Sequence, residues 1–186
     1  MRQICKSGRS MRGFTLIEML VTLLVLAIIL GFAIPSFTDQ IRNNRSLTFG
    51  EEFATALNYV RSEAVKRSGS VSVCASNDAG TGCGSDWTNG WLAFVDEAAN
   101  TTDASVTVGE VLRYWDPANN EMTLEVTRGG SATDFVRFVS MGGLARINND
   151  NVPVNATAKH ESCTGNAARA IRVGVSGSVQ MRRVNC

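Results

Sequence analysis

Histidine is almost absent from this chain, which has one, His160, among its 186 residues. A single imidazole leaves little material for a histidine-based metal site or catalytic triad. The short C-x2–4-C spacing of structural zinc sites, glycine-rich phosphate loops and the EF-hand spacing are also lacking. We therefore expect no metal, no cofactor and no enzymatic activity.

A large excess of charge of one sign is lacking as well, because the chain has 18 basic and 17 acidic residues. Residues 1–13 hold four of the basic residues and no acid, so the other 173 residues carry 14 basic and 17 acidic groups. This balance excludes a globally basic nucleic-acid-binding protein and leaves room only for a local basic patch. The length is that of one ordinary domain, and a hydrophobic content of 44% argues against disorder.

A long apolar run, residues 14–34, follows the basic start and contains one charge, Glu18. As a helix it would span about 31 Å, which matches a hydrocarbon core of roughly 30 Å. The preceding cations predict a cytoplasmic N-terminus. A cleaved secretory signal would have a shorter apolar run that ends in small residues, whereas this run leads into Pro35-Ser36-Phe37.

Helical periodicity continues after the apolar run, so we expect one helix over residues 14–68. Pro35 should kink or locally break this helix rather than end it. One apolar stripe at helical spacing consists of Phe49, Phe53, Leu57, Val60 and Ala64. Arg67 and Gly69 are typical of a helix C-terminus.

The apolar period changes to two beyond residue 69, which predicts a β domain over residues 69–186. Short strands are expected at residues 71–73, 91–95, 111–115, 122–126, 135–139, 171–175 and 179–184. Residues 76–90 and 141–168 are polar and predict loops. Because no second helix-length pattern appears, we expect an antiparallel sheet and an α+β fold with a long N-terminal helix packed against it.

Five cysteines are present, and Cys5 lies in the basic leader. The other four, Cys74, Cys83, Cys163 and Cys186, follow the apolar run, on the exported side of the predicted span. Four cysteines allow three pairings, of which we favour pairing between neighbours, Cys74 with Cys83 and Cys163 with Cys186.

The segment Gly13-Phe14-Thr15-Leu16-Ile17-Glu18, after a short basic leader, resembles the type IV prepilin signature. The resemblance implies that a prepilin peptidase cleaves after Gly13, removing leader 1–13, and that the new N-terminal Phe14 is N-methylated. A carboxylate inside a membrane helix usually has a partner or a function. We expect Glu18 to pair with the α-amino group of Phe14 on a neighbouring subunit during assembly. The alternative is a tolerated charge that reaches the interface.

Later segments resemble the GspH/FimT group of minor pilins and pseudopilins. They are residues 57–67, residues 71–74, Trp87 with residues 90–96, and a late strand that runs into a C-terminal cysteine. The resemblance implies a minor pilin of a type IV pilus that primes or caps filament assembly. It also implies a single-pass inner-membrane protein that is later extracted from the membrane into a pilus or periplasmic filament. The implied partners are other minor pilins, the major pilin, the inner-membrane assembly platform and inner-membrane lipid.

Two alternatives to this role stay open: a pseudopilin of type II secretion, and a pilin that binds DNA for uptake. The DNA interpretation depends on Arg169, Arg172, Arg182 and Arg183 near the C-terminus. Cations on an edge strand also discourage aggregation, which needs no ligand. Arg182 and Arg183 must point to opposite faces if their strand is regular.

Overall fold

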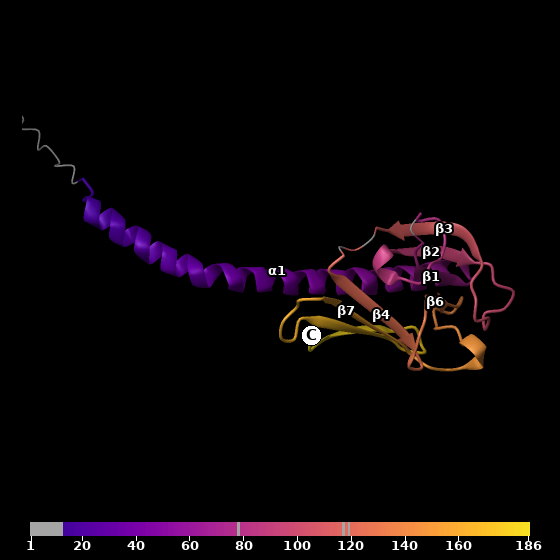
Figure 1. Cartoon of the computed structure of the whole chain (residues 1–186). Helices are drawn as coiled ribbons and strands as arrows, with labels where there is room; N and C mark the ends of the chain where they lie inside the picture. The colour runs from indigo at the N-terminus through magenta and orange to yellow at the C-terminus, as the bar shows by residue number, and fades with distance from the viewer. Residues whose placement is uncertain (1–12, 78, 117, 119) are drawn as a thin grey trace, which may run out of the picture. The chain divides into compact units, whose positions relative to one another are not determined.

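The computed structural model describes residues 13–77, 79–116, 118 and 120–186 (Figure 1). Residues 1–12 of the expected leader, with Cys5, lie outside the described residues. The chain forms two compact units, which divide between Thr38 and Asp39. One helix, α1 (Leu16–Arg67), contributes to both units, and its bounds agree with the helix predicted over residues 14–68.

In the first unit, the large apolar side chains of α1 are exposed on every side of the helix. Phe14, just before the helix, is 75% exposed, and large apolar residues of the helix remain exposed as far as Phe37. The sequence predicted that Pro35 would not end the helix, and α1 indeed continues past this residue to Arg67. None of the described helices reaches the combination of length and hydropathy that a membrane span requires. The span over residues 14–34 therefore stays a prediction.

The second unit contains two antiparallel sheets. The four-stranded sheet has the order β3-β2-β1-β6, formed by β1 (Val71–Ala75), β2 (Trp91–Asp96), β3 (Val108–Trp115) and β6 (Phe135–Phe138). The five-stranded sheet has the order β5-β4-β7-β8-β9, formed by β4 (Met122–Arg128), β5 (Ser131–Ala132), β7 (Val154–His160), β8 (Ala168–Val173) and β9 (Val179–Val184). Two short 3-10 helices, η1 (Trp87–Asn89) and η2 (Ile147–Asn149), lie in the connections.

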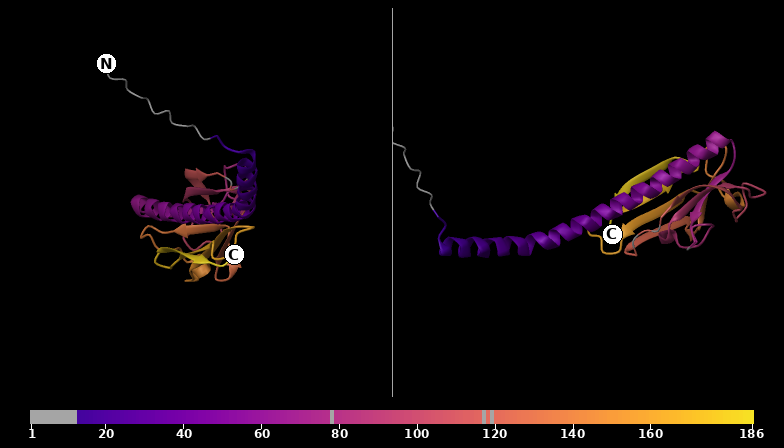
Figure 2. Two further views of the ribbon diagram at one scale, coloured as in Figure 1. Left: turned by 90° about the vertical axis from the view of Figure 1, so that its left-hand side faces the viewer. Right: turned by 90° about the horizontal axis from the view of Figure 1, so that it is seen from above.

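One hydrophobic core joins the later turns of α1 to both sheets. All five residues of the predicted apolar stripe are buried in it. Phe53 packs edge-on against Trp87 and Trp91, with ring centroids 5.3 Å apart in each pair. The last turns of α1 lie beside the strands in each view (Figures 1 and 2). This packing confirms the α+β fold expected from the sequence.

The four-stranded sheet is covered on its other face by loops. Cys74, Leu92 and Phe94 form a small second core there, against which Cys83 and Val106 pack. The bond between Cys74 and Cys83, with Cα atoms 5.6 Å apart, fixes the loop that follows β1. Because both faces are covered, every residue of β1 is buried, Ser72 included, and β2 begins with a continuous apolar run from Trp91 to Val95.

A buried ion pair fixes the second covering loop, residues 97–107. Arg137 Nε donates to Asp96 Oδ2 at 2.7 Å, and neither side chain is exposed to solvent. The remaining guanidinium nitrogens donate to main-chain oxygens of the loop, those of Thr101, Asp103 and Ser105, at 2.7–3.0 Å. The loop is therefore tied to β6 through one side chain.

One prediction about the sheets is wrong. Strand β7 lies inside residues 141–168, which were expected to be a loop, and it pairs with both β4 and β8. Its buried positions alternate as Val154, Ala156, Ala158 and His160. Alanine contributes little hydrophobicity to a pattern, so the alternation was hidden among polar neighbours.

Candidate functional site

The amino-terminal motif opens helix α1. Thr15 Oγ1 accepts the backbone N–H of Glu18 at 3.3 Å, and the Thr15 carbonyl oxygen accepts that of Met19 at 3.2 Å. Thr15 therefore caps the helix, and Glu18 lies in its first turn, where the helix dipole favours a negative charge. Our sequence analysis missed this cap, although Thr-x-x-Glu is a recognised helix-start pattern.

The register of β8 and β9 separates the four arginines into two pairs. Arg169 lies opposite Arg183, Ala170 opposite Arg182, and Arg172 opposite Gln180. Side chains alternate along a strand, so Arg172 and Arg182 share one face of the sheet, while Arg169 and Arg183 share the other. The structure therefore does not bring all four candidate DNA contacts to one surface.

Arg169 is buried against helix α1. Its Nη1 donates to the carbonyl oxygens of Ala167 at 2.7 Å and Ala168 at 3.1 Å. A Cβ atom added to Gly50 would lie 2.7 Å from Arg169 Cβ, so the glycine makes room for this side chain. Burial lowers the pKa of the Arg169 guanidinium, and the charge of Arg183 adds to this effect. Arg169 is a structural residue of the helix–sheet interface.

Arg172 and Arg182 face a hollow of about 600 Å³ on the outer face of the five-stranded sheet. The small side chains of Ala170 and Thr157 are among its lining residues. Both arginines are exposed and form no ion pair within the described part of the chain. Because β9 is an edge strand, this basic surface is open along one side.

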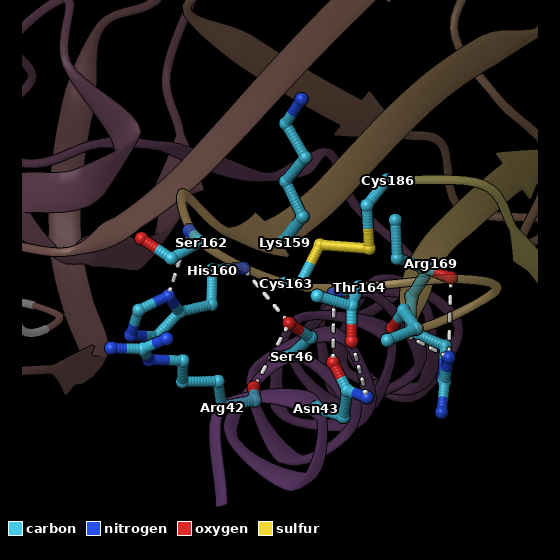
Figure 3. The surroundings of a disulfide bond; sticks show 12 residues. Arg42, Asn43, Ser46, Lys159, His160, Ser162, Cys163, Thr164, Arg169 and Cys186 are labelled. Atoms are coloured by element: carbon cyan, nitrogen blue, oxygen red, sulfur yellow. Dashed lines mark hydrogen bonds between the residues drawn. A yellow bond between two sulfur atoms is a disulfide. The ribbon is translucent and has the colours of Figure 1, made fainter. Parts of the chain in front are cut away.

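A second disulfide lies at the C-terminus (Figure 3). Cys163, in the loop between β7 and β8, is bonded to Cys186, and their Cα atoms are 5.9 Å apart. The backbone N–H of Cys186 also donates to the carbonyl oxygen of Gly165 at 3.0 Å. The last residue of the chain is therefore held on this loop, which agrees with the neighbour pairing favoured from the sequence.

The same loop and the end of β7 contact helix α1 through a set of hydrogen bonds (Figure 3). Thr164 N–H donates to Asn43 Oδ1 at 3.1 Å, and Asn43 Nδ2 donates to Thr164 Oγ1 at 3.4 Å. The backbone N–H of His160 donates to Ser46 Oγ at 2.8 Å, and that hydroxyl donates to the Arg42 carbonyl oxygen at 3.2 Å. We call this set, with the Cys163–Cys186 bond, the C-terminal clamp. Sequence reasoning did not find Asn43 or Ser46, because polar residues on a helix carry no sign of a long-range partner.

The single histidine is part of the clamp. The His160 side chain is 2% exposed, its Nδ1 accepts the backbone N–H of Ser162 at 3.1 Å, and its Nε2 lies 3.1 Å from Glu121 Oε2. Because Nδ1 is an acceptor, the neutral ring carries its proton on Nε2 and donates it to Glu121. Both ring nitrogens of His160 therefore have partners. The nearby Cys163 is in a disulfide, so it offers no free thiol for His160 to activate.

Family models match two parts of the chain. The model of type II transport protein GspH matches residues 50–178, and the prokaryotic N-terminal methylation motif matches residues 8–34. Comparison with curated proteins gave no significant match.

Two solved structures resemble the chain. They are crystal structures of the type IV minor pilin FimU of Pseudomonas aeruginosa, in space groups P21 and P65. The first has 21% sequence identity and a TM-score of 0.57, with 75% of this chain and 89% of that chain covered. The second also has 21% identity, with a TM-score of 0.54 and coverage of 73% and 91%. At this identity the similarity demonstrates a shared fold.

Proposed function

Because this chain belongs to the GspH family, we propose that it is a minor pilin that helps to prime or cap the assembly of a type IV pilus. The observation that carries the proposal is the motif from Gly13 to Glu18 at the start of a helix whose apolar side chains are exposed. Such a helix needs apolar surroundings, which a membrane or the helical core of a filament supplies. The role is structural, with no reaction catalysed by this chain.

We propose that the chain is first inserted into the inner membrane and processed there. Prepilin peptidase removes leader 1–13 after Gly13, and Phe14 becomes N-methylated. Residues 14–34 then hold the protein as a single span with a cytoplasmic N-terminus, and the β domain, residues 69–186, lies outside. The assembly platform transfers the subunit from lipid into a filament that contains other minor pilins and the major pilin.

Glu18 has a specific part in this proposal. Its carboxylate pairs with the α-amino group of Phe14 on a neighbouring subunit, because the two charges are each costly alone in apolar surroundings and attract each other. The Thr15 cap supports this role, since it forms the first turn of the helix on which Glu18 is carried.

The experiment that tests the proposal counts surface pili per cell in a clean deletion strain and in the complemented strain. Loss of pili on deletion, restored by complementation, supports a pilus-assembly subunit. Secretion of type II substrates is measured in the same strains. Normal pili with impaired secretion would instead assign the chain to a secretion system.

A second candidate function, DNA capture, is favoured only by Arg172 and Arg182 on the open outer face. Two phosphate contacts predict weak binding, with a slope of log K against log salt of about −2. Fluorescence anisotropy of labelled DNA should show this slope and lose the signal in the double variant R172A/R182A. Arg146→Ala, on an exposed residue elsewhere, is the control.

A further inference from the structure

Arg128, the last residue of β4, has hydrogen-bonding groups without partners. Its Nη1 donates to the carbonyl oxygen of Ala145 at 2.9 Å. Its Nε and Nη2 are shut off from solvent, and neither has a hydrogen-bond partner within the part of the chain that the structure describes. These two nitrogens lie on one edge of the planar guanidinium, the edge that binds a carboxylate through two parallel hydrogen bonds.

Arg128 has no carboxylate within ion-pair distance among the described residues. Arg137, whose charge acts on Arg128, already has Asp96 as its partner at 2.7 Å. Asp150 is close enough to raise the pKa of Arg128, but the two form no ion pair in the described structure. Burial and the charge of Arg137 lower the pKa of Arg128. One partly buried positive charge is therefore left without a counter-ion, an arrangement that costs free energy unless an anion is bound.

A hollow of about 420 Å³ lies beside this guanidinium. Its lining includes Arg128, Gly129 in the β4–β5 turn, Ser131 of β5, Thr133 directly after β5, and Asp150. We call it the Arg128 pocket. Because Nε and Nη2 are covered, a ligand reaches them only by displacing the atoms that cover them.

We propose that the Arg128 pocket binds a carboxylate group, whose two oxygens accept Nε–H and Nη2–H of Arg128. The carboxylate belongs either to an acidic side chain of a neighbouring subunit or to a free small molecule. Both sources present the same two oxygens. Asp150 on the rim weakens binding through like-charge repulsion, which sets the affinity of the pocket.

The first test follows the arginine Nε–H signals of the 15N-labelled full-length protein in detergent micelles. Sodium acetate replaces sodium chloride at constant ionic strength. We expect one signal, assigned to Arg128 by its loss in R128K, to move with acetate and to saturate. The midpoint of thermal unfolding should rise with acetate in the wild type and not in R128K.

Two control variants make this test specific. Arg146→Lys, next to the Ala145 carbonyl, should respond to acetate as the wild type does, because Arg146 is exposed and lies outside the pocket. Asp150→Asn should lower the acetate concentration at half saturation. A wild-type Arg128 signal that does not saturate, or equal thermal responses of R128K and R146K, overturns the proposal.

The source of the carboxylate is decided by filament incorporation of R128K. Reduced incorporation, with R146K incorporated normally, assigns the carboxylate to a neighbouring subunit. Normal incorporation of an R128K protein that has lost acetate binding assigns it to a small molecule. The acetate measurement does not depend on the proposed pilin role, so failure of one can be told from failure of the other.

Discussion

The substitution Asp96→Asn removes one charge from the buried pair between Asp96 and Arg137. Asp96 accepts hydrogen bonds from Arg137 Nε at 2.7 Å and Ser72 Oγ at 2.6 Å, and from the backbone N–H groups of Ala98 and Thr107 at 3.1 Å. In the variant, Arg137 keeps its charge, has no exposed surface and loses its only carboxylate partner among the described residues. Breaking a buried pair in this way costs about 3–5 kcal/mol.

This loss is measurable by urea unfolding of the full-length protein in detergent, followed by tryptophan fluorescence. The reporters are buried, because Trp87, Trp91 and Trp115 are each at most 6% exposed. Glu125→Gln, on an exposed residue of β4, is the matched control, and we expect it to change the free energy of unfolding by less than about 0.5 kcal/mol. A loss below about 1 kcal/mol in Asp96→Asn would refute the argument that the pair fixes the loop.

The same pair predicts a dependence of stability on pH. Burial alone would raise the pKa of Asp96, but the hydrogen bonds from Arg137 and Ser72 outweigh it and lower the pKa. A carboxyl group with a lowered folded-state pKa stabilises the fold above its unfolded pKa of about 3.9 and loses that contribution as the pH falls further. Wild-type stability should therefore decrease below about pH 4, and Asp96→Asn should lack this part of the decrease.

Three further predictions test other contacts. Gly50→Ala should lower the free energy of unfolding measured in urea, because the new Cβ meets the Arg169 side chain. This loss should outweigh the preference of alanine over glycine in a helix, which is about 1 kcal/mol, and a gain in stability would contradict the contact. Replacing Cys163 and Cys186 by serine should cost about 3 kcal/mol and speed amide exchange in residues 42–46, and unchanged exchange there would argue against the clamp. Glu18→Ala should leave the protein in the membrane fraction but lower its incorporation into filaments, whereas normal incorporation would remove the proposed pairing.

The helix and most strands could be predicted because their apolar residues follow the period of the element. The stripe that contains Phe53 and Leu57 is buried as its spacing requires. Strand β7 could not be found in this way, since Ala156 and Ala158 carry its buried face and polar residues lie between them. A central strand of this kind is stabilised by its neighbours in the sheet, and the local sequence does not show them.

In the candidate site, too, some features could be predicted from the sequence and others could not. That Arg182 and Arg183 point to opposite faces follows from strand geometry alone. The burial of Arg169 does not, because it depends on the register of β8 and on the nearby Gly50 in α1, more than 100 residues earlier in the chain. That Nε and Nη2 of Arg128 have no partner among the described residues can likewise be seen only when the surrounding side chains are in place.

The C-terminal clamp also defines a path for mechanical load. Tension that enters the second unit along α1 reaches the helix turn of Asn43 and Ser46 early, and the hydrogen bonds there pass it to His160 and Thr164. The adjoining disulfide carries the force on to the end of β9, so that β7 and β9 bear it together. Because the bond is covalent, the end of β9 stays joined to the β7–β8 loop even where hydrogen bonds nearby open under load.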